Sequence, residues 1–498
     1  MTCIEWPKGA LNAPSPWFLI PPCKAACPAG IDIRTYIDCA AQGQYEKALA
    51  VIEEKIPFPA TVGRVCPHPC EAKCNRKDYD ASIAINDLKR FIVDHVNTKR
   101  VRKQISVQTR TYAERVAIVG AGPAGLTAAF NLVRRGYGVT VFEALPSAGG
   151  MLTTGIPEYR LPRDVVTTEI EDIQKCGVEI RLNSPVERNG LTLDGLFQQG
   201  YHAVFIATGA HRSLPLGVSG EELEGVHHGA AFLKDVNLRK KEKIGEKVAV
   251  IGGGNVAIDA ARTALRCGSN EVVLVYRRSR GEMPAYPEEM AAAEKEGVKF
   301  HYLAMPSRIL GTDGKVTALE CLRVELGDLD ESGRRRPVPV KRSEFVIDVK
   351  AVISAVGEVP DLSFLDFKKF QVTSDGKLEV NPHSLMTNVS GVFAGGDSVT
   401  GPATVIEAIA AGKKVAASID LYLRGKTSGG EEPIPRTISL EEVDTVRFNK
   451  RERQRMAALP VEERVKGFKE IELGFNEMEA LCEADRCFQC GLFPKRHN

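Results

Sequence analysis

Residues 116–125 read Val116-Ala-Ile-Val-Gly120-Ala-Gly122-Pro-Ala-Gly125. Four apolar residues typical of a buried strand lead into three glycines, which open a helical pattern over residues 124–135. The first glycine permits a tight turn, the second lets the backbone approach a pyrophosphate, and the third lets helix and strand pack closely. The next strand pattern ends at Glu143, where a carboxylate can accept hydrogen bonds from a ribose. The stretch therefore predicts the dinucleotide turn of a Rossmann-like domain.

The strand–turn–helix pattern returns about 130 residues later, as Val248-Ala-Val-Ile-Gly252-Gly-Gly254-Asn-Val-Ala257. The strand pattern that follows ends in Tyr276-Arg277-Arg278, with no carboxylate for a ribose. Planar guanidinium groups bind phosphate through paired hydrogen bonds, so this end favours the 2′-phosphate of NADP(H) over NAD(H). The alternative is that both arginines form a solvated surface. Two such units predict duplicated dinucleotide-binding domains.

Two further features are best explained by a flavin. Apolar strands that end in Ala207-Thr208-Gly209 and Ser354-Ala-Val-Gly357 predict crossovers between the two domains. Gly395-Gly396-Asp397 then leads through Gly401-Pro-Ala403-Thr404 into a helical pattern over residues 405–421. A carboxylate at a strand end, followed by a helix N-terminus, can hold a ribityl chain and direct a positive dipole at an isoalloxazine. A plain strand–helix junction is the alternative.

The composition is that of an ordinary globular protein and excludes several classes of function. Of the 498 residues, 43% are hydrophobic and 26% charged, and the net charge of +2 gives no field for nucleic acid or an anionic membrane. No apolar run approaches the ~20 residues of a membrane-spanning helix. Residues 1–22 are broken by prolines and do not read as a secretory signal, so we expect a cytoplasmic protein.

Thirteen cysteines are unusual in such a chain, and their placement indicates metal or redox chemistry. Six lie from Cys23 to Cys74 and three from Cys482 to Cys490. A secreted disulfide scaffold is short and evenly cross-linked, unlike this chain. Some cysteines lie outside the motifs and are expected to be ordinary apolar residues: Cys3, Cys39, Cys176, Cys267, Cys321 and Cys482.

From about Cys23 to Tyr422, the chain resembles the glutamate synthase small-subunit family. This FAD and iron–sulfur oxidoreductase module also forms the N-terminal part of dihydropyrimidine dehydrogenase. Besides the two glycine turns and the stretch Gly395–Thr404, the resemblance rests on Cys27-Pro28, Gly63-Arg-Val-Cys66-Pro67, Gly149-Gly150-Met151, Gly155-Ile-Pro157, Arg160-Leu-Pro162, Tyr276-Arg-Arg278 and Glu282-Met-Pro284.

The resemblance implies electron transfer between NAD(P)H, FAD and 4Fe–4S clusters, in either direction. Because the cofactors carry the hydride chemistry, we expect no catalytic acid, base or nucleophile among the side chains. Together with the motifs, it gives the expected FAD contacts: Gly120, Gly122, Pro123, Ala124, Gly125, Glu143, Gly150, Met151, Arg160, Gly396, Asp397, Ala403 and Thr404. The expected nucleotide contacts are Gly252, Gly254, Asn255, Val256, Ala257, Arg277, Arg278 and Gly357.

The cysteine motif departs from the family pattern, which begins Cys-x2-Cys-x4-Cys-x3-Cys-Pro. Ser15 and Phe18 occupy the positions of the first pair, and neither is a thiolate. Cys487-Phe-Gln-Cys490-Gly491 resembles this opening motif moved to the C-terminus. We therefore expect one cluster, shared within one chain or between two, at Cys23, Cys74, Cys487 and Cys490. The alternative is a free or zinc-binding pair on a tail.

A second cluster is expected at Cys27, Cys66 and Cys70. In the family the fourth ligand is Gln or Glu within a stretch that corresponds here to Ile83–Phe91, and Lys89 stands at that position. A protonated ammonium cannot donate to iron. Either Asp87, His68 or water completes this site, or the second cluster is absent, so the expectation is one or two 4Fe–4S clusters.

We expect an α/β fold with two Rossmann-like domains and a helical iron–sulfur domain in front of them. The predicted parts are an iron–sulfur domain over 1–110, an FAD domain over 111–231 and 351–425, and an inserted NAD(P) domain over 232–350. The last part, 426–498, begins with a Gly-rich linker and ends in Cys-x-x-Cys. Within it, residues 449–459 and 460–470 have charged, amphipathic patterns typical of helices.

The leading interpretation is an NAD(P)H-linked flavin and iron–sulfur electron-transfer subunit of a larger complex. Its expected partners are a nicotinamide nucleotide and a redox subunit or carrier protein, in a hetero-oligomer or homodimer. One alternative is a self-sufficient flavin reductase of a small molecule or quinone. Another is a non-catalytic FAD-binding redox sensor or assembly protein. Two complete glycine turns disfavour the sensor, which need not keep both nucleotide sites.

Overall fold

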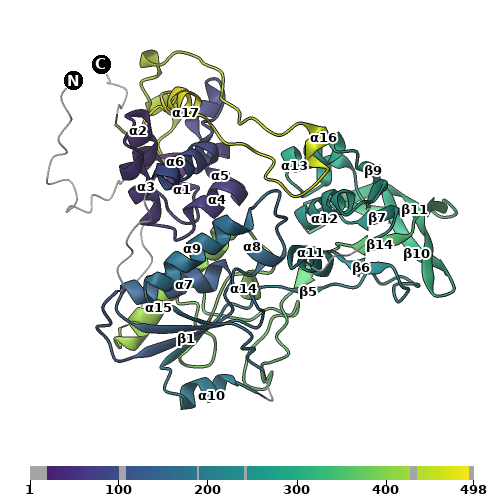
Figure 1. Ribbon diagram of the computed structural model, residues 1–498, viewed down its shortest axis with the longest axis horizontal. Coiled ribbons are helices and arrows are strands. Elements are labelled where there is room, and N and C mark those ends of the chain that lie inside the picture. The colour runs from purple at the N-terminus through teal and green to yellow at the C-terminus, as the bar shows by residue number, and fades with distance from the viewer. Residues whose placement is uncertain are drawn as a thin grey trace.

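The turn at Gly120 lies in a parallel five-stranded sheet of a computed structural model, which describes residues 19–99, 108–187, 190–239, 244–331, 333–426 and 435–492. The strand order is β16 (Val392–Ala394), β4 (Ala203–Ile206), β1 (Arg115–Val119), β2 (Gly138–Phe142) and β3 (Glu179–Arg181). Helices α7 (Pro123–Arg134) and α15 (Val405–Leu423) pack together on one face (Figure 1). No helix in the described ranges is long and apolar enough to cross a membrane.

The turn at Gly252 lies in a second parallel sheet, inserted into the chain between β4 and β16. Its order is β6 (Val226–His228), β14 (Ala351–Ser354), β7 (Lys247–Ile251), β8 (Glu271–Tyr276) and β9 (Lys299–Tyr302). Helix α12 (Asn255–Arg266) follows β7 and covers one face of this sheet. The two crossovers pair as a short antiparallel ribbon of β5 (Arg212–Ser213) and β15 (Glu358–Val359). The predicted insertion of one Rossmann-like domain into another is thus observed.

The strand pairing shifts both predicted borders between these domains. Residues 226–228 and 351–354 were assigned to the FAD domain, but they form β6 and β14 of the second sheet. Strand β14 is fully buried between β6 and β7, which explains why its apolar run resembles a central strand of either domain. The crossover ribbon of β5 and β15 is therefore the structural border.

The other face of the second sheet is covered by a small antiparallel sheet. It consists of β10 (Ala304–Thr312), β11 (Lys315–Leu329), β12 (Arg335–Pro339) and β13 (Phe345–Asp348). Apolar side chains of this layer, including Ile309 and Leu319, pack against Ala249 and Val273 of the parallel sheet. Helices on one face and a β-layer on the other make the nucleotide domain a three-layered unit.

The iron–sulfur domain is a group of short helices. They are α1 (Pro22–Ala25), α2 (Ile33–Ala41), α3 (Tyr45–Glu53), α4 (Pro59–Val65), α5 (Pro69–Ala72), the 3-10 turn η1 (Asn75–Asp78) and α6 (Ile85–Lys99). Proline opens α1, α4 and α5, which fixes the backbone angle at each helix start. The helical character expected for this domain is thus observed. Cys3, Ser15, Phe18 and most of the predicted linker lie outside the described residues.

The extension over residues 435–492 differs from the prediction. The expected helix over 449–459 is not formed, and only α16 (Val461–Arg464) occurs within 460–470. The charges of this segment instead pair with the iron–sulfur domain, as in the contacts of Glu470 with Arg64 and Arg90 at 2.7 and 2.8 Å. The extension runs from the iron–sulfur domain to the nucleotide domain and back (Figure 1), where α17 (Glu477–Ala484) precedes the last cysteines.

Candidate functional site

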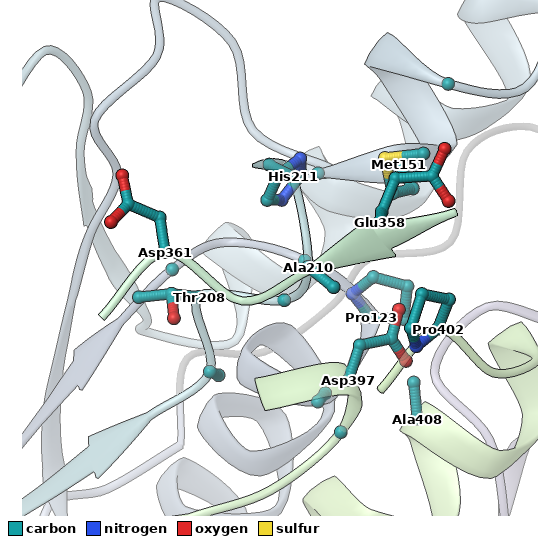
Figure 2. A pocket seen from close by; sticks show the side chains of 18 of the residues that line it. Pro123, Met151, Thr208, Ala210, His211, Glu358, Asp361, Asp397, Pro402 and Ala408 are labelled. Carbon is teal, nitrogen blue, oxygen red and sulfur yellow. The ribbon is translucent and has the colours of Figure 1, made fainter. Parts of the chain in front are cut away.

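A cavity of about 570 Å³, called here the flavin cavity, opens where the three domains meet. Val65 of the iron–sulfur domain and His211 of the crossover both line it. Figure 2 shows Pro123, Met151 and Asp397 around this space. Fourteen of the expected cofactor residues line the cavity: Gly120, Gly122, Pro123, Ala124, Glu143, Gly150, Met151, Arg160, Asn255, Val256, Gly396, Asp397, Ala403 and Thr404.

Glycines shape the floor of the flavin cavity at the start of α7. A Cβ on Gly150, whose φ is +54°, would lie 2.9 Å from Cα of Gly122, so the two backbones approach this closely only because residue 150 has no side chain. Gly125 has a different role, because its Cβ would lie 2.0 Å from the carbonyl oxygen of Gly120. Gly125 therefore packs helix against strand and does not line the cavity. The N-terminus of α7 has no side-chain cap, which leaves its N–H groups for an anion.

Glu143 is held rigidly at the end of β2. Its side chain is 7% exposed, and its two carboxylate oxygens accept hydrogen bonds from the N–H groups of Ala121 and Leu145, at 2.8 and 2.9 Å. A carboxylate fixed in this way can accept further hydrogen bonds from a ribose without reorganising.

Asp397 and the loop that precedes α15 line the flavin cavity beside Pro123 at the start of α7 (Figure 2). Burial raises the pKa of Asp397 to about 6, although the N–H of Ala403 opposes this rise. Thr404 caps α15 and exchanges hydrogen bonds with Glu407. The buried hydroxyl of Thr208, which also lines the cavity, has no hydrogen-bond partner among the described residues. An unsatisfied hydroxyl, a glycine cradle and two helix N-termini fit a dinucleotide such as FAD.

The second glycine turn has the same construction at the start of α12. Gly252 adopts φ +145°, and its Cβ would lie 2.3 Å from the carbonyl oxygen of Ala355, so the position requires glycine. Gly254 precedes the helix and faces open space. Ala257 is fully buried against this turn. Gly357 lies in the crossover, outside the cavity lining, and its carbonyl oxygen accepts a hydrogen bond from Leu214.

The structure separates the two arginines at the end of β8. Arg278 is buried, donates to the carbonyl oxygen of Arg335 at 2.7 Å, and forms an ion pair with Asp330. These contacts hold the hairpin of β11 and β12 against the parallel sheet, which accounts for Arg278 without a nucleotide. Arg277 is exposed beside the turn and makes no salt bridge within the described part of the chain.

Arg160 lines the flavin cavity, but its guanidinium group bridges two domains. It contacts Asp259 of α12 at 2.8 Å and Glu289 of α13 (Pro287–Lys295) at 3.1 Å. Asp259 is buried, so the ion pair fixes the nucleotide domain against the flavin domain in this arrangement. Arg160, which was expected to contact FAD, therefore also forms an ion pair between domains that its sequence motif did not indicate.

A second, small cavity brings the two ends of the chain together. Cys23 of α1, Cys74 before η1, and Cys487 and Cys490 after α17 all line it, so we call it the four-cysteine cavity. Its other lining residues include the apolar Ile33, Ile37 and Phe488. These four cysteines are the predicted ligand set, and a single chain supplies all of them.

The chemistry of this donor set fits a cluster. Burial, and then the charges of neighbouring thiolates, raise the pKa of Cys23, while burial raises that of Cys490 to about 11 although the Asn75 amide donates to its sulfur. Iron cations bound to the sulfurs would offset the burial and the mutual repulsion of the four thiolates. No three His, Cys, Asp or Glu side chains in the described ranges are arranged to hold one metal ion. A cubane requires a wider spacing, because each thiolate ligates a different iron.

Buried charges hold the extension beside the four-cysteine cavity. Arg486 contacts Glu483 and Asp80 at 2.7 and 3.1 Å, and all three side chains are nearly inaccessible to solvent. Glu483 also accepts from the N–H of Ala84 at 2.8 Å, and Arg76 donates to the carbonyl oxygen of Arg486 at 2.6 Å. Removing one partner of such a network leaves a buried charge unpaired, which typically costs about 3–5 kcal/mol.

A third cavity lies between the other two and is lined by Cys27, Cys66 and Cys70, so we call it the three-cysteine cavity. Lys89 of α6 lines it as well, whereas neither Asp87 nor His68 does. The His68 ring lies 3.6 Å from Glu71, and Asp87 faces charges of the extension, including Arg453. Neither side-chain alternative for a fourth ligand therefore lines the cavity with the three cysteines.

Several residues of the flavin cavity were missed in the sequence. Tyr286, His211, Glu358 and Asp259 all line it. Tyr286 directly precedes α13, and its N–H donates to the Asn255 side chain at 3.0 Å. Burial, reinforced by Lys234, lowers the pKa of His211, and burial raises that of Glu358, with Asp397 adding to the rise. Asp259 lies on α12, Glu358 on β15, Tyr286 just before α13 and His211 just before β5, so the four residues come together only in the folded chain and no local motif marks them.

Two family models match the chain. Residues 114–412 match the pyridine nucleotide-disulphide oxidoreductase family, and residues 19–101 match dihydropyrimidine dehydrogenase domain II, 4Fe-4S cluster. The first model covers both parallel sheets and every lining residue of the flavin cavity except Val65. The second covers the helical domain with five of the seven predicted cluster cysteines.

Three curated relatives illustrate the range of matches. The chain is 45% identical to the NADP(+)-dependent formate dehydrogenase subunit beta of Moorella thermoacetica, over 95% of this chain and 71% of that one. It is 40% identical to the NADPH-Fe(3+) oxidoreductase subunit beta of Geobacter sulfurreducens, over 94% and 75%. The Escherichia coli glutamate synthase [NADPH] small chain is 34% identical, over 81% and 89%.

A solved structure supports the fold alone. FprA of Mycobacterium tuberculosis in complex with NADPH aligns with a TM-score of 0.52 at 20% identity, over 64% of this chain and 88% of that one. The aligned fraction is close to the size of the two Rossmann-like domains. A similarity at this level of identity supports the arrangement of sheets and helices in this chain, but it assigns no role to any residue.

Proposed function

Because the chain belongs to the pyridine nucleotide-disulphide oxidoreductase family, we propose that it is the NADPH-linked subunit of a larger redox complex. The family matches confirm the predicted resemblance, the α/β fold class, and an NAD(P)H-dependent oxidoreductase with FAD and 4Fe–4S cofactors. Relatives named as beta subunits or small chains support a partner subunit for this chain too. The residues proposed for each cofactor are those placed above.

One observation carries the proposal: the three cavities form a continuous series through neighbouring residues. Val65 lines the flavin cavity, and the next residue, Cys66, lines the three-cysteine cavity. On α15, Val405 likewise lines the flavin cavity and Ile406 lines the three-cysteine cavity. Ile33 and Ile85 then line both cysteine cavities. Groups held in these cavities would be separated by little more than one layer of side chains.

The chain's own residues would position these cofactors and exclude water from them. FAD would supply the hydride acceptor, and the clusters would supply one-electron carriers. Gly122 and Gly150 allow close approach to a pyrophosphate, Glu143 is placed for a ribose, and α15 directs its positive end into the flavin cavity. Arg160 keeps the nucleotide domain against that cavity through Asp259.

Nucleotide choice should depend on Arg277 and not on Arg278. Replacing Arg277 with alanine removes a charge-assisted contact to the 2′-phosphate, worth about 1.5–3 kcal/mol, so the KM for NADPH should rise roughly ten- to a hundredfold. The KM for NADH should change little. Arg308→Ala, which removes an exposed arginine on β10 of the same domain, is the matched control. Equal effects of Arg277→Ala on both nucleotides would exclude this role.

Anaerobic titration of the purified chain with NADPH tests the proposed function. Each NADPH delivers two electrons, so FAD alone consumes one equivalent, and clusters in electronic contact with it consume more. We expect flavin bleaching to be accompanied by the paramagnetic spectrum of reduced clusters. Consumption that stops at one equivalent per FAD, with no change in the iron spectrum, would leave only a flavin reductase.

A further inference from the structure

We propose that the three-cysteine cavity holds a three-iron cluster, [3Fe–4S], whose open corner faces Lys89. The inference rests on the proposed function, because this cavity is the step between the flavin cavity and the four-cysteine cavity. It departs from the 4Fe–4S cluster that the family model describes for residues 19–101.

The first support is the donor set. Three thiolates line the cavity, and the remaining lining is mostly apolar, with Ile31, Ile85 and Ile406 among it. The Tyr36 hydroxyl also lines the cavity, but it donates to the carbonyl oxygen of Ile85 at 3.1 Å. No carboxylate, imidazole or fourth thiol of the described chain enters this lining. A fourth iron would therefore have no protein ligand among the residues that the structure describes.

The second support is the charge of Lys89. Its side chain is 5% exposed, and it makes no salt bridge with any carboxylate in the described ranges. Buried charges in proteins are paired, since an isolated ammonium in an apolar setting is very costly. Lys89 stabilises the thiolate forms of Cys66 and Cys70 electrostatically, against the larger effect of burial. The anionic partner of this ammonium is therefore the group that the cysteines hold.

The positive charge of Lys89 favours a three-iron cluster over a cubane in this cavity. In a cubane, the fourth corner is an iron cation, which the Lys89 ammonium would repel. Without that iron, the corner exposes three sulfides and the core is more negative, so it attracts the ammonium and can accept its hydrogen bonds. A lysine at the position of the family's Gln or Glu ligand thus disfavours the fourth iron by both charge and ligation.

Iron analysis and electron paramagnetic resonance of the whole chain, purified without oxygen, test the inference. We expect about seven irons per chain, three from this site and four from the four-cysteine cavity. An all-ferric three-iron cluster is paramagnetic, whereas an oxidised cubane is not, so the unreduced protein should show a signal. That signal should persist after incubation with ferrous iron and a thiol reductant, which would rebuild a damaged cubane.

Two variants separate ligation from charge. Lys89→Cys supplies a fourth thiolate, so the oxidised-state signal should disappear and the iron content should rise by about one per chain. Lys89→Met removes the charge but adds no strong ligand, and it should keep the signal. If Lys89→Cys fails to fold, the wild-type spectrum still decides the question.

The outcomes are distinct from those that test the proposed function. Two cubanes and no oxidised-state signal in the wild type would overturn this inference and leave the proposed function standing. Absence of any iron that depends on Cys27, Cys66 and Cys70 would overturn it as well. A three-iron signal in a chain whose flavin NADPH does not reduce would overturn the proposed function alone.

Discussion

Replacing Gly122 with valine should yield a folded chain that has lost its FAD. The backbone at Gly122 is extended, with φ −80°, and an added Cβ would have only Cα of Gly150 within 4.0 Å. The fold therefore tolerates the change, while the valine side chain occupies the approach to the pyrophosphate. Losing about two charge-assisted hydrogen bonds costs roughly 3–6 kcal/mol, or about 10²–10⁴-fold in affinity. Flavin absorbance per mole of purified chain measures the effect.

Gly254 offers the matched control at the second turn. Its backbone is also extended, and nothing lies within 4 Å of an added Cβ. Gly254→Val should keep full FAD content but lose bleaching by NADPH. A Gly122→Val protein that remains yellow at full stoichiometry would refute the assignment of the first turn. If the Gly254→Val protein loses its flavin instead, the second turn binds FAD and the first binds the nicotinamide nucleotide.

The parts of this molecule that follow from local sequence were predictable. The strand–turn–helix units at Gly120 and Gly252 begin and end within about one residue of their expected positions, because their glycines are required locally by turn geometry and close packing. The placement of Cys23 and Cys74 beside Cys487 and Cys490 could be anticipated because the family's opening motif lacks two cysteines here and a matching pair occurs near residue 490. Each of these inferences uses residues that lie close together in the chain or share a chemical role.

The parts that depend on distant partners were not predictable. Arg278 looked equivalent to Arg277, but its partners Asp330 and Arg335 come from a hairpin more than 50 residues away. The segment 449–470 has helical periodicity, yet its charges are used in contacts such as Arg453 with Glu71 at 2.6 Å. In both cases, tertiary ion pairs determined the conformation and no local signal revealed them.

The second large effect is expected at the four-cysteine cavity. Replacing Cys487 and Cys490 with serine removes two of four thiolates, so the cluster at this cavity should not be retained. Point substitution is a better test than deleting residues 481–498, since the deletion would also remove Glu483 and Arg486 and leave Asp80 without its Arg486 partner. Cys482→Ser is the matched control, because Cys482 is exposed and lines neither cysteine cavity.

The iron content and the paramagnetic spectrum of this double variant, measured after anaerobic reduction by NADPH, show whether the two ends of the chain hold one cluster. We expect the double variant to lose about four irons per chain and one cluster signal. FAD content and bleaching by NADPH should remain, since the flavin cavity shares no lining residue with the four-cysteine cavity. Unchanged iron and an unchanged spectrum in the double variant would contradict a cluster built from the two ends of the chain.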